Sequence, residues 1–211
     1  MIVLSRRLCQ LYAGLLLYGV SLAMMLNAAL GLDPWDVFHQ GLADLTGLSF
    51  GTATVITGVV VLLFWIPLRE RPGLGTVSNV LVIGPTVDIT SPLLPTPHTL
   101  LPSFLLLAAG IVLNGVASGA YIGAGFGPGP RDGLMTGIHR RSGRSLRLIR
   151  TSIELSVLAV GFLLGGTIGL GTVLYAVTIG PLVQFFLPVL TPAPRPAGKE
   201  DLSRQEAERS D

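Results

Sequence analysis

Six long apolar segments limit the folds that this chain can adopt. They cover approximately residues 8–30, 51–68, 76–94, 103–124, 148–165 and 172–190. At 1.5 Å of rise per residue, a helix of this length crosses the roughly 30 Å hydrocarbon layer of a bilayer. Backbone groups in lipid must be hydrogen-bonded internally, and a helix does this within one segment. The pattern therefore predicts an all-α transmembrane protein, a bundle of six helices.

The composition supports this class and argues against several functions. Only 12% of the residues are charged and half are hydrophobic, whereas soluble domains carry about 25% charged residues. The single cysteine, Cys9, cannot form an intramolecular disulfide. No Walker motif, nucleophile elbow or metal-ligand cluster occurs in the sequence, so we expect no enzyme activity, cofactor or metal. Clustered arginines in such a chain indicate topology rather than a nucleic-acid partner.

The chain contains an internal repeat. Residues 14–95 align with residues 110–191 without a gap at an offset of 96, and 25 of the 82 pairs are identical. The identities include residues 73–77 with 169–173 and residues 83–85 with 179–181, which are rich in Gly and Pro. Apolar segments match by chance at Leu and Val, but not at Gly, Pro and Asp with one fixed offset. We therefore expect two three-span repeats, residues 1–98 and 99–190.

Charge placement predicts that the two repeats have opposite orientations. Lys and Arg mark the cytoplasmic side of short loops. They occur before the first span and after the second, fourth and sixth, and the loops after the first, third and fifth spans have none. Both termini are therefore expected in the cytoplasm. Residues 191–211, which are rich in Pro, Ala and mixed charges, are expected to be a disordered cytoplasmic tail.

Each repeat contains a predicted helix break followed by a short extra helix. The stretch GAGFGPGPRDG (residues 123–133) does not fit the G-x-G-x-x-G dinucleotide pattern and follows an apolar helix rather than a strand. Proline cannot donate a backbone hydrogen bond, so it ends a helix but suits the first turn of the next. The expected breaks involve Gly31 and Pro34 in the first repeat and Gly127, Pro128 and Pro130 in the second. Pro85 and Pro181, inside the third and sixth spans, are expected to break or kink them.

Two interpretations of the short helices, residues 34–46 and 130–142, remain open. They are either amphipathic helices on the membrane surface, with Asp36 and Asp132 stabilising their first turns, or re-entrant segments whose N-termini point into a cavity. Transporters with inverted repeats place broken helices around a central site.

Ionisable and polar residues in the apolar segments and short helices are candidates for binding a substrate or ion, because burying them in lipid is costly. The candidates are Asp36, Asp88, Asn114, Arg131, Asp132 and Glu154. The alternatives are an interfacial pair of Glu154 with Arg150 and simple helix bridging by Asn114. His39 and His139 are expected to be solvated, and Trp35 and Trp65 to lie in interfacial belts.

Further expectations concern partners. Arg140, Arg141 and Arg144 could contact anionic lipid headgroups, although topology alone explains them. Glycines at every fourth position from Gly115 to Gly127 predict a helix-packing face. Gly161, Gly165 and Gly169 could support a homodimer, or be consumed by packing within one chain.

The stretches GLDPWDVFHQGLADLTGLSFGT, RPGLGT, GAGFGPGPRDGLMTG and RTSIE resemble the YczE-like branch of the YitT/YczE family of bacterial multi-pass membrane proteins. The resemblance extends to about residue 190 and implies a location in the bacterial cytoplasmic membrane. It implies no activity and no functional residues. The repeat itself suggests a small-solute permease or exporter, and the alternative is a membrane partner or scaffold that does not transport.

Overall fold

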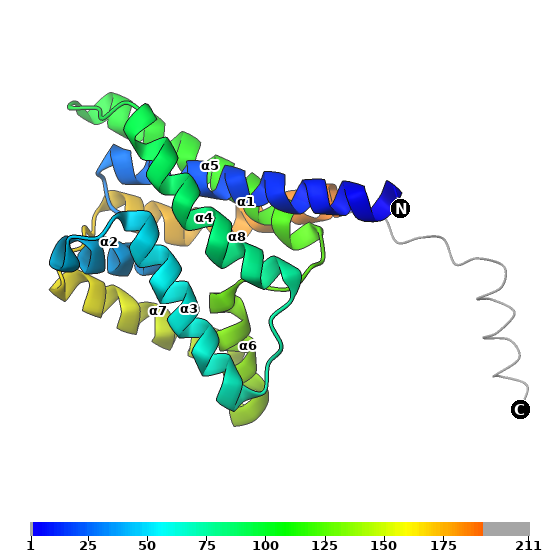
Figure 1. Ribbon diagram of the computed structural model, residues 1–211. Helices are drawn as coiled ribbons and strands as arrows, with labels where there is room; N and C mark the ends of the chain where they lie inside the picture. The colour runs from blue at the N-terminus through cyan, green and yellow to red at the C-terminus, as the bar shows by residue number, and fades with distance from the viewer. Residues whose placement is uncertain (1, 192–211) are drawn as a thin grey trace, which may run out of the picture.

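The computed structural model describes residues 2–191, which form eight α-helices and one short 3₁₀ helix (Figure 1). The α-helices are α1 (Ile2–Ala28), α2 (Pro34–Thr46), α3 (Phe50–Leu68), α4 (Leu74–Thr90), α5 (Leu100–Gly123), α6 (Pro130–Ser142), α7 (Leu146–Leu163) and α8 (Leu170–Leu190). The 3₁₀ helix η1 (Ser91–Leu93) follows α4. The tail that the sequence predicts to be disordered lies, apart from Thr191, outside the described residues.

Each predicted apolar segment corresponds to one long helix, but not all six have the properties of a membrane span. In residues 2–191, four helices are long and apolar enough to cross a membrane: α1, α3, α5 and α8. Helix α4 has 17 residues, and α7 has 18 residues that include Arg147, Arg150 and Glu154. The all-α membrane architecture is therefore confirmed, with four candidate spans rather than six by length and composition.

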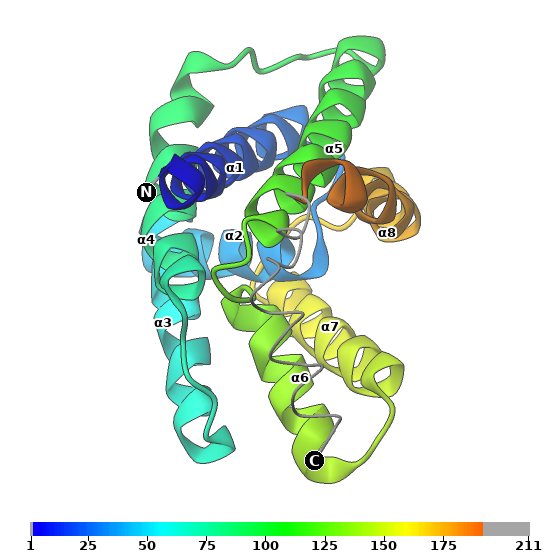
Figure 2. The same cartoon turned by 90° about the vertical axis from the view of Figure 1, so that its right-hand side faces the viewer.

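Helix α1 forms the centre of the packing. It lies against α5 and α4, and α5 packs in turn on α8. Leu11, Leu15 and Leu22 of α1 are completely buried, together with Leu107 of α5. The short helix α2 lies against α7 and α3, and α6 lies against α3 and α7. In Figure 2, α1 and α5 are above α2, and α6 and α7 are below it.

The predicted glycine face of α5 packs on α8. A Cβ atom at Gly115, Gly119 or Gly123 would approach Leu182, Phe186 or Leu190, at 2.7–3.0 Å. Two of the glycines considered for a dimer are also used within the chain, because Gly161 lies against the backbone of Phe38 and Gly169 against the carbonyl of Leu30.

The two short helices begin at prolines that follow left-handed glycines. Gly31 (φ 106°) precedes Pro34, and Gly127 (φ 113°) precedes Pro130. Pro85 and Pro181 behave differently from the expectation of helix breaks, because α4 and α8 continue through them. Proline removes one backbone hydrogen bond, and packing against neighbouring helices can hold such a helix together.

Both breaks are tied to the other half of the chain by backbone hydrogen bonds. The Gly75 N–H at the start of α4 donates to the Phe126 carbonyl at 2.9 Å, and the Gly171 N–H at the start of α8 donates to the Leu30 carbonyl at 2.7 Å. Donors and acceptors of the two bonds are each offset by 96 positions. As a result, the start of α2 is anchored on α8 and the start of α6 on α4.

Candidate functional site

The first turn of α2 is organised by Asp33. Its Oδ1 atom accepts hydrogen bonds from the backbone N–H groups of Trp35 (2.8 Å) and Asp36 (2.9 Å). Pro34 occupies the first helical position, where no N–H is needed. Asp33 is 3% exposed and Asp36 is fully buried. The N-cap therefore places two carboxylates side by side inside the protein.

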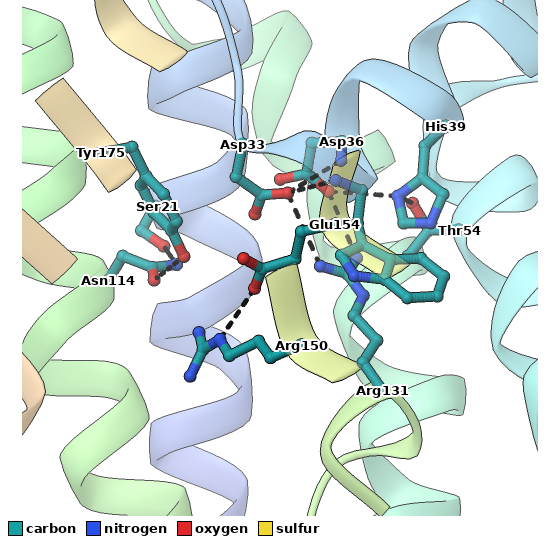
Figure 3. Close-up of polar contacts among 11 residues, drawn as sticks. Ser21, Asp33, Asp36, His39, Thr54, Asn114, Arg131, Arg150, Glu154 and Tyr175 are labelled. Carbon is teal, nitrogen blue, oxygen red and sulfur yellow. Dashed lines mark hydrogen bonds and ion pairs between the residues drawn. The ribbon is translucent and has the colours of Figure 1, made fainter. Parts of the chain in front are cut away.

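Arg131, from the first turn of α6, reaches this pair of carboxylates across the two halves. Its guanidinium lies 3.4 Å from Asp36 Oδ1 and 3.7 Å from Asp33 Oδ1 (Figure 3). It also lies over the indole ring of Trp35, 5.1 Å from the centroid, within the range of a cation–π interaction. Side chains from the N-terminal ends of the two short helices thus meet.

His39 lies one turn after Asp36 and extends the cluster into α3. Its Nδ1 is 3.1 Å from Asp36 Oδ1 and 3.2 Å from Thr54 Oγ1, and the Thr54 hydroxyl donates to the Phe50 carbonyl. Both polar contacts of the ring are therefore made by Nδ1, and the buried Nε2 atom has no hydrogen-bond partner. The expectation of a solvated His39 is wrong, since the residue is 1% exposed. Helix α2 turns this side chain towards α3 rather than towards water.

A cavity of about 130 Å³ lies at this junction. Asp33, Trp35 and His39 line it from the α2 side, and Arg131 and Asp132 from the α6 side. Its wall also contains one tyrosine from each of α1, α5 and α8 (Tyr18, Tyr121 and Tyr175). Helix α7 contributes the pair Arg150–Glu154, and α3 contributes Thr54 and Thr57. Such a mixture of aromatic and convergent polar groups is typical of a small-molecule site.

Buried polar atoms without a hydrogen-bond partner gather beside this cavity. Among the described residues these atoms are Trp35 Nε1, Asp36 Oδ2, His39 Nε2 and Thr57 Oγ1. All four belong to α2 or α3, and Trp35, His39 and Thr57 are also cavity-lining residues. Leaving such groups unpaired costs about 1–3 kcal/mol each, so water or a ligand that paired with them would stabilise this part of the protein.

Burial shifts the pKa values of the ionisable groups on the short helices. Burial, reinforced by the charge of Asp36 and opposed by Arg131, raises the pKa of Asp33 to about 6. Burial also raises the pKa of Asp36 and of Asp132, against the attraction of Arg131 and, for Asp132, of Arg150. The pKa of His39 lies well below its usual value because of burial and the nearby Arg131. His39 is therefore neutral at physiological pH.

The remaining candidates from the sequence lie at different distances from this centre. Glu154 accepts from Arg150 Nε at 2.8 Å, and both line the cavity. Asn114 joins three helices: it donates to Ser21 Oγ of α1 (2.8 Å) and accepts from the Tyr175 hydroxyl of α8 (3.0 Å). It does not line the cavity itself, but its partner Tyr175 does.

Asp88 lies outside the cavity wall and stabilises the N-terminus of α3. It accepts from the Ser49 hydroxyl (2.5 Å) and from the Gly51 backbone N–H (2.8 Å). The structure therefore brings Asp36, Arg131, Asp132 and Glu154 to one place, Asn114 behind it, and Asp88 to a helix cap.

The sequence interpretation did not include several residues of this cluster. Asp33 and His39 carried a detectable signal, namely an Asp-Pro N-cap and an i,i+3 spacing from Asp36. Trp35 and Trp65 are buried at 6% and 2% exposure rather than placed in interfacial belts. The Trp65 indole donates to the Pro130 carbonyl at 3.0 Å, so α6 covers the ring.

The basic residues at the end of α6 are at the surface. Arg140 forms an ion pair with Glu70, and Arg141 and Arg144 are exposed. Within residues 2–191 no group of three or more His, Cys, Asp or Glu side chains is arranged to hold a metal ion.

Comparison with known proteins shows the family. A family of unknown function (DUF6198) matches residues 5–188. The chain belongs to this family. This chain is 37% identical over 180 residues to the uncharacterised membrane protein YczE of Bacillus subtilis. The match covers 84% of this chain and 83% of the relative. The resemblance seen in the sequence is confirmed.

Two further relatives are also uncharacterised. One, from Haemophilus influenzae, is 41% identical over 83% of this chain and 81% of its own length. The other, YyaS of Bacillus subtilis, is 26% identical over 84% of this chain and 90% of its own length. No solved structure matches the chain. The protein is thus a multi-pass membrane protein with bacterial homologues.

Proposed function

We propose that the protein is a small-solute transporter of the bacterial cytoplasmic membrane that works by alternating access. The observation that carries this proposal is the cavity at the junction of α2 and α6, lined by buried polar groups of which several have no partner. A scaffold needs packing faces, but it does not need unpaired polar groups around a cavity. Transporters built from inverted repeats bind their substrates at such junctions of broken helices.

The internal repeat supports this mechanism. The proposal counts six spans: the four candidate spans, α4 together with η1, and α7. Each half then has three spans, and an odd number of spans makes the second half enter the membrane from the opposite side. Two of the three charges on α7 are compatible with a span, because Arg150 and Glu154 form an ion pair and line the cavity, and the third, Arg147, lies in the first turn of the helix. Further support comes from the two backbone bonds of Gly75 and Gly171, which connect the halves in equivalent ways. Both termini would be cytoplasmic.

The proposal predicts that the cavity is reached from each side of the membrane in turn. The test uses a Cys9→Ser background with Thr57→Cys, a small change at an unpaired hydroxyl of the cavity wall. A membrane-impermeant thiol reagent is applied separately to right-side-out and inside-out vesicles. We expect the thiol to react from both sides, more slowly than an exposed position does.

Two single-cysteine controls fix the sidedness of the vesicles. Thr96→Cys lies in the loop after η1, which has no Lys or Arg, and should react only from outside. Ser142→Cys lies at the C-terminal end of α6, beside the basic connection to α7, and should react only from the cytoplasmic side. Reaction of Thr57→Cys from one side only would favour a non-transporting membrane partner.

A further inference from the structure

The charges around the cavity are unequal. Four carboxyl groups (Asp33, Asp36, Asp132 and Glu154) and two guanidinium groups (Arg131 and Arg150) line it or contact its wall. Arg150 is already paired with Glu154 at 2.8 Å. This leaves Arg131 as the partner of Asp33 and Asp36. An anionic substrate would enter a site with excess acid, whereas a cation would reduce the excess.

Arg131 makes the contacts that a bound organic cation would make. It lies over the Trp35 ring and beside both carboxylates. Its distances to Asp36 and Asp33, 3.4 and 3.7 Å, are longer than the 2.7–2.9 Å that is typical of a charge-assisted hydrogen bond. The Arg131 side chain is also 26% exposed, whereas the carboxylates are nearly inaccessible. It is therefore held loosely by a site that could hold a cation more closely.

The unpaired atoms also indicate a ligand rich in hydrogen-bond donors. Asp36 Oδ2 is a carboxylate acceptor without a donor, and the nearby His39 Nε2 has no partner either. Arg131 reaches only the other oxygen of Asp36, Oδ1. Guanidinium and ammonium groups supply several N–H donors and no acceptor, and such a group beside Asp36 would supply the donor that Oδ2 lacks.

The cavity limits the size of this ligand. Its volume is about 130 Å³, slightly less than the roughly 150 Å³ of a protein cavity that binds benzene. A small alkylguanidinium or alkylamine fits this space, and a large lipophilic cation does not.

We propose that Asp33, Asp36 and the face of Trp35 form a binding site for a small organic cation of the guanidinium or amine class, and that Arg131 occupies this site when the ligand is absent. The inference deepens the proposed function by naming its substrate class and rests on it for the transport step. Ligand and Arg131 compete for the same carboxylates, so Arg131 lowers the apparent affinity for the ligand. Displacing Arg131 also breaks its contact between α6 and α2. Ligand binding is thereby coupled to the movement of one half of the protein relative to the other.

The test measures equilibrium binding to the purified full-length protein in detergent at about pH 7.5, with methylguanidinium as the probe. Methylurea is its neutral isostere, and acetate serves as an anionic probe of similar size. We expect saturable binding of methylguanidinium that is about tenfold or more tighter than that of methylurea, and no saturable binding of acetate. Asp36→Asn should weaken methylguanidinium binding about tenfold or more. Glu70→Gln, a carboxylate outside the cavity, should leave it unchanged.

Arg131→Gln tests the competition itself. It removes the competing charge but keeps an amide, so methylguanidinium should bind several-fold more tightly, whereas Arg140→Gln should have no effect. Equal binding of methylurea, preferential binding of acetate, or weaker methylguanidinium binding by folded Arg131→Gln would overturn the inference. If Arg131→Gln does not fold, the wild-type comparison of methylguanidinium with methylurea decides.

This outcome can be separated from that of the transport proposal. If methylguanidinium does not bind but Thr57→Cys reacts from both sides, the protein is a transporter of another class of solute. If methylguanidinium binds and Thr57→Cys reacts from one side only, the cation site belongs to a protein that does not transport.

Discussion

At the scale of single residues, Asp33 has two separable roles. It caps α2 through its Oδ1 atom, and it contributes negative charge beside Arg131. Asn is as good an N-cap as Asp, so Asp33→Asn keeps the first role and removes the second. This variant isolates the charge.

The charge of Asp33 should make stability depend on pH. Burial and Asp36 raise its pKa from 3.8 to about 6, so the folded protein holds this proton more tightly than the unfolded chain does. Stability from this group is present below about pH 4 and is lost as the pH rises through about 6, by up to about 3 kcal/mol. The thermal unfolding temperature in detergent should therefore fall between about pH 4 and pH 7, and less steeply in Asp33→Asn.

The pKa values of Asp36 and Asp132 are also raised, so the unfolding temperature of Asp33→Asn should still fall to some extent as the pH rises. Identical pH profiles for wild type and Asp33→Asn would contradict the prediction. An Asp33→Ala variant, which also loses the cap, should be less stable than Asp33→Asn at every pH by about 1 kcal/mol.

Most charged residues that meet in the site are recognisable in the sequence as candidates, but Asp33 is not among them, and the contacts that bring them together are not predictable. Asp36 and Arg131 are 95 positions apart, and nothing local to either one predicts that they touch. The burial of His39 is not predictable for the same reason, because it depends on how α2 packs against α3. The residues next to His39 in the sequence do not distinguish a buried histidine from a solvated one.

At the scale of helices, α6 is held against α3 by a glycine opposite a tryptophan. A Cβ atom at Gly133 would lie 1.9 Å from the Trp65 ring. Gly133→Ala should therefore displace this ring and its hydrogen bond to Pro130, destabilising the protein by about 1–3 kcal/mol. Gly180→Ala is the matched control, since a Cβ there meets nothing within 4 Å and alanine favours helix.

The measurement is the thermal unfolding temperature of each variant in detergent. It should fall for Gly133→Ala and be unchanged or slightly raised for Gly180→Ala. Gly133→Ala combined with Trp65→Phe should recover part of the loss, because the smaller ring leaves room for the methyl group. A double variant as unstable as the sum of the two single changes would show that the Gly133–Trp65 contact is not the cause.

The helices themselves were largely predictable, because hydrophobic length and Pro-Gly punctuation are local signals. Pro34 and Pro130 each start a helix, and the predicted limits of both short helices agree with α2 and α6. Pro85 and Pro181 look equivalent in sequence but lie within continuous helices. The difference comes from position: a proline in the first turn gives up no hydrogen bond, whereas one in the interior depends on its neighbours for support.

At the scale of the whole molecule, the two equivalent contacts between halves are not equally close. Helix α2 approaches α7 at Gly41, where a Cβ would lie 2.6 Å from the Gly161 carbonyl. At Gly137 of α6, the position equivalent to Gly41, the nearest atoms on the α3 side are side-chain atoms of Glu70 and Leu68 at 3.1 Å. If the halves are inverted repeats, exchanging their conformations gives the opposite-facing state. That state should tighten α6 against α3 and loosen α2 from α7.

Spin labels at equivalent positions test this exchange. One pair joins α2 to α7 (Leu45→Cys with Leu163→Cys), and the other joins α6 to α3 (Arg141→Cys with Pro67→Cys), each in the Cys9→Ser background. All four positions are exposed, and the pairs are related by the offset of 96. Distances measured by double electron–electron resonance in proteoliposomes should show two populations, with the first pair lengthening as the second shortens.

The relative sizes of these populations should change with pH, because Asp33 titrates near pH 6 and its charge holds Arg131 between the halves. Between about pH 5 and about pH 8, the population with the longer distance should therefore increase for one pair of labels and decrease for the other. One fixed distance for each pair at both pH values would contradict an exchange between halves. A change confined to one pair would indicate a local movement of one short helix, which an alternating-access mechanism does not predict.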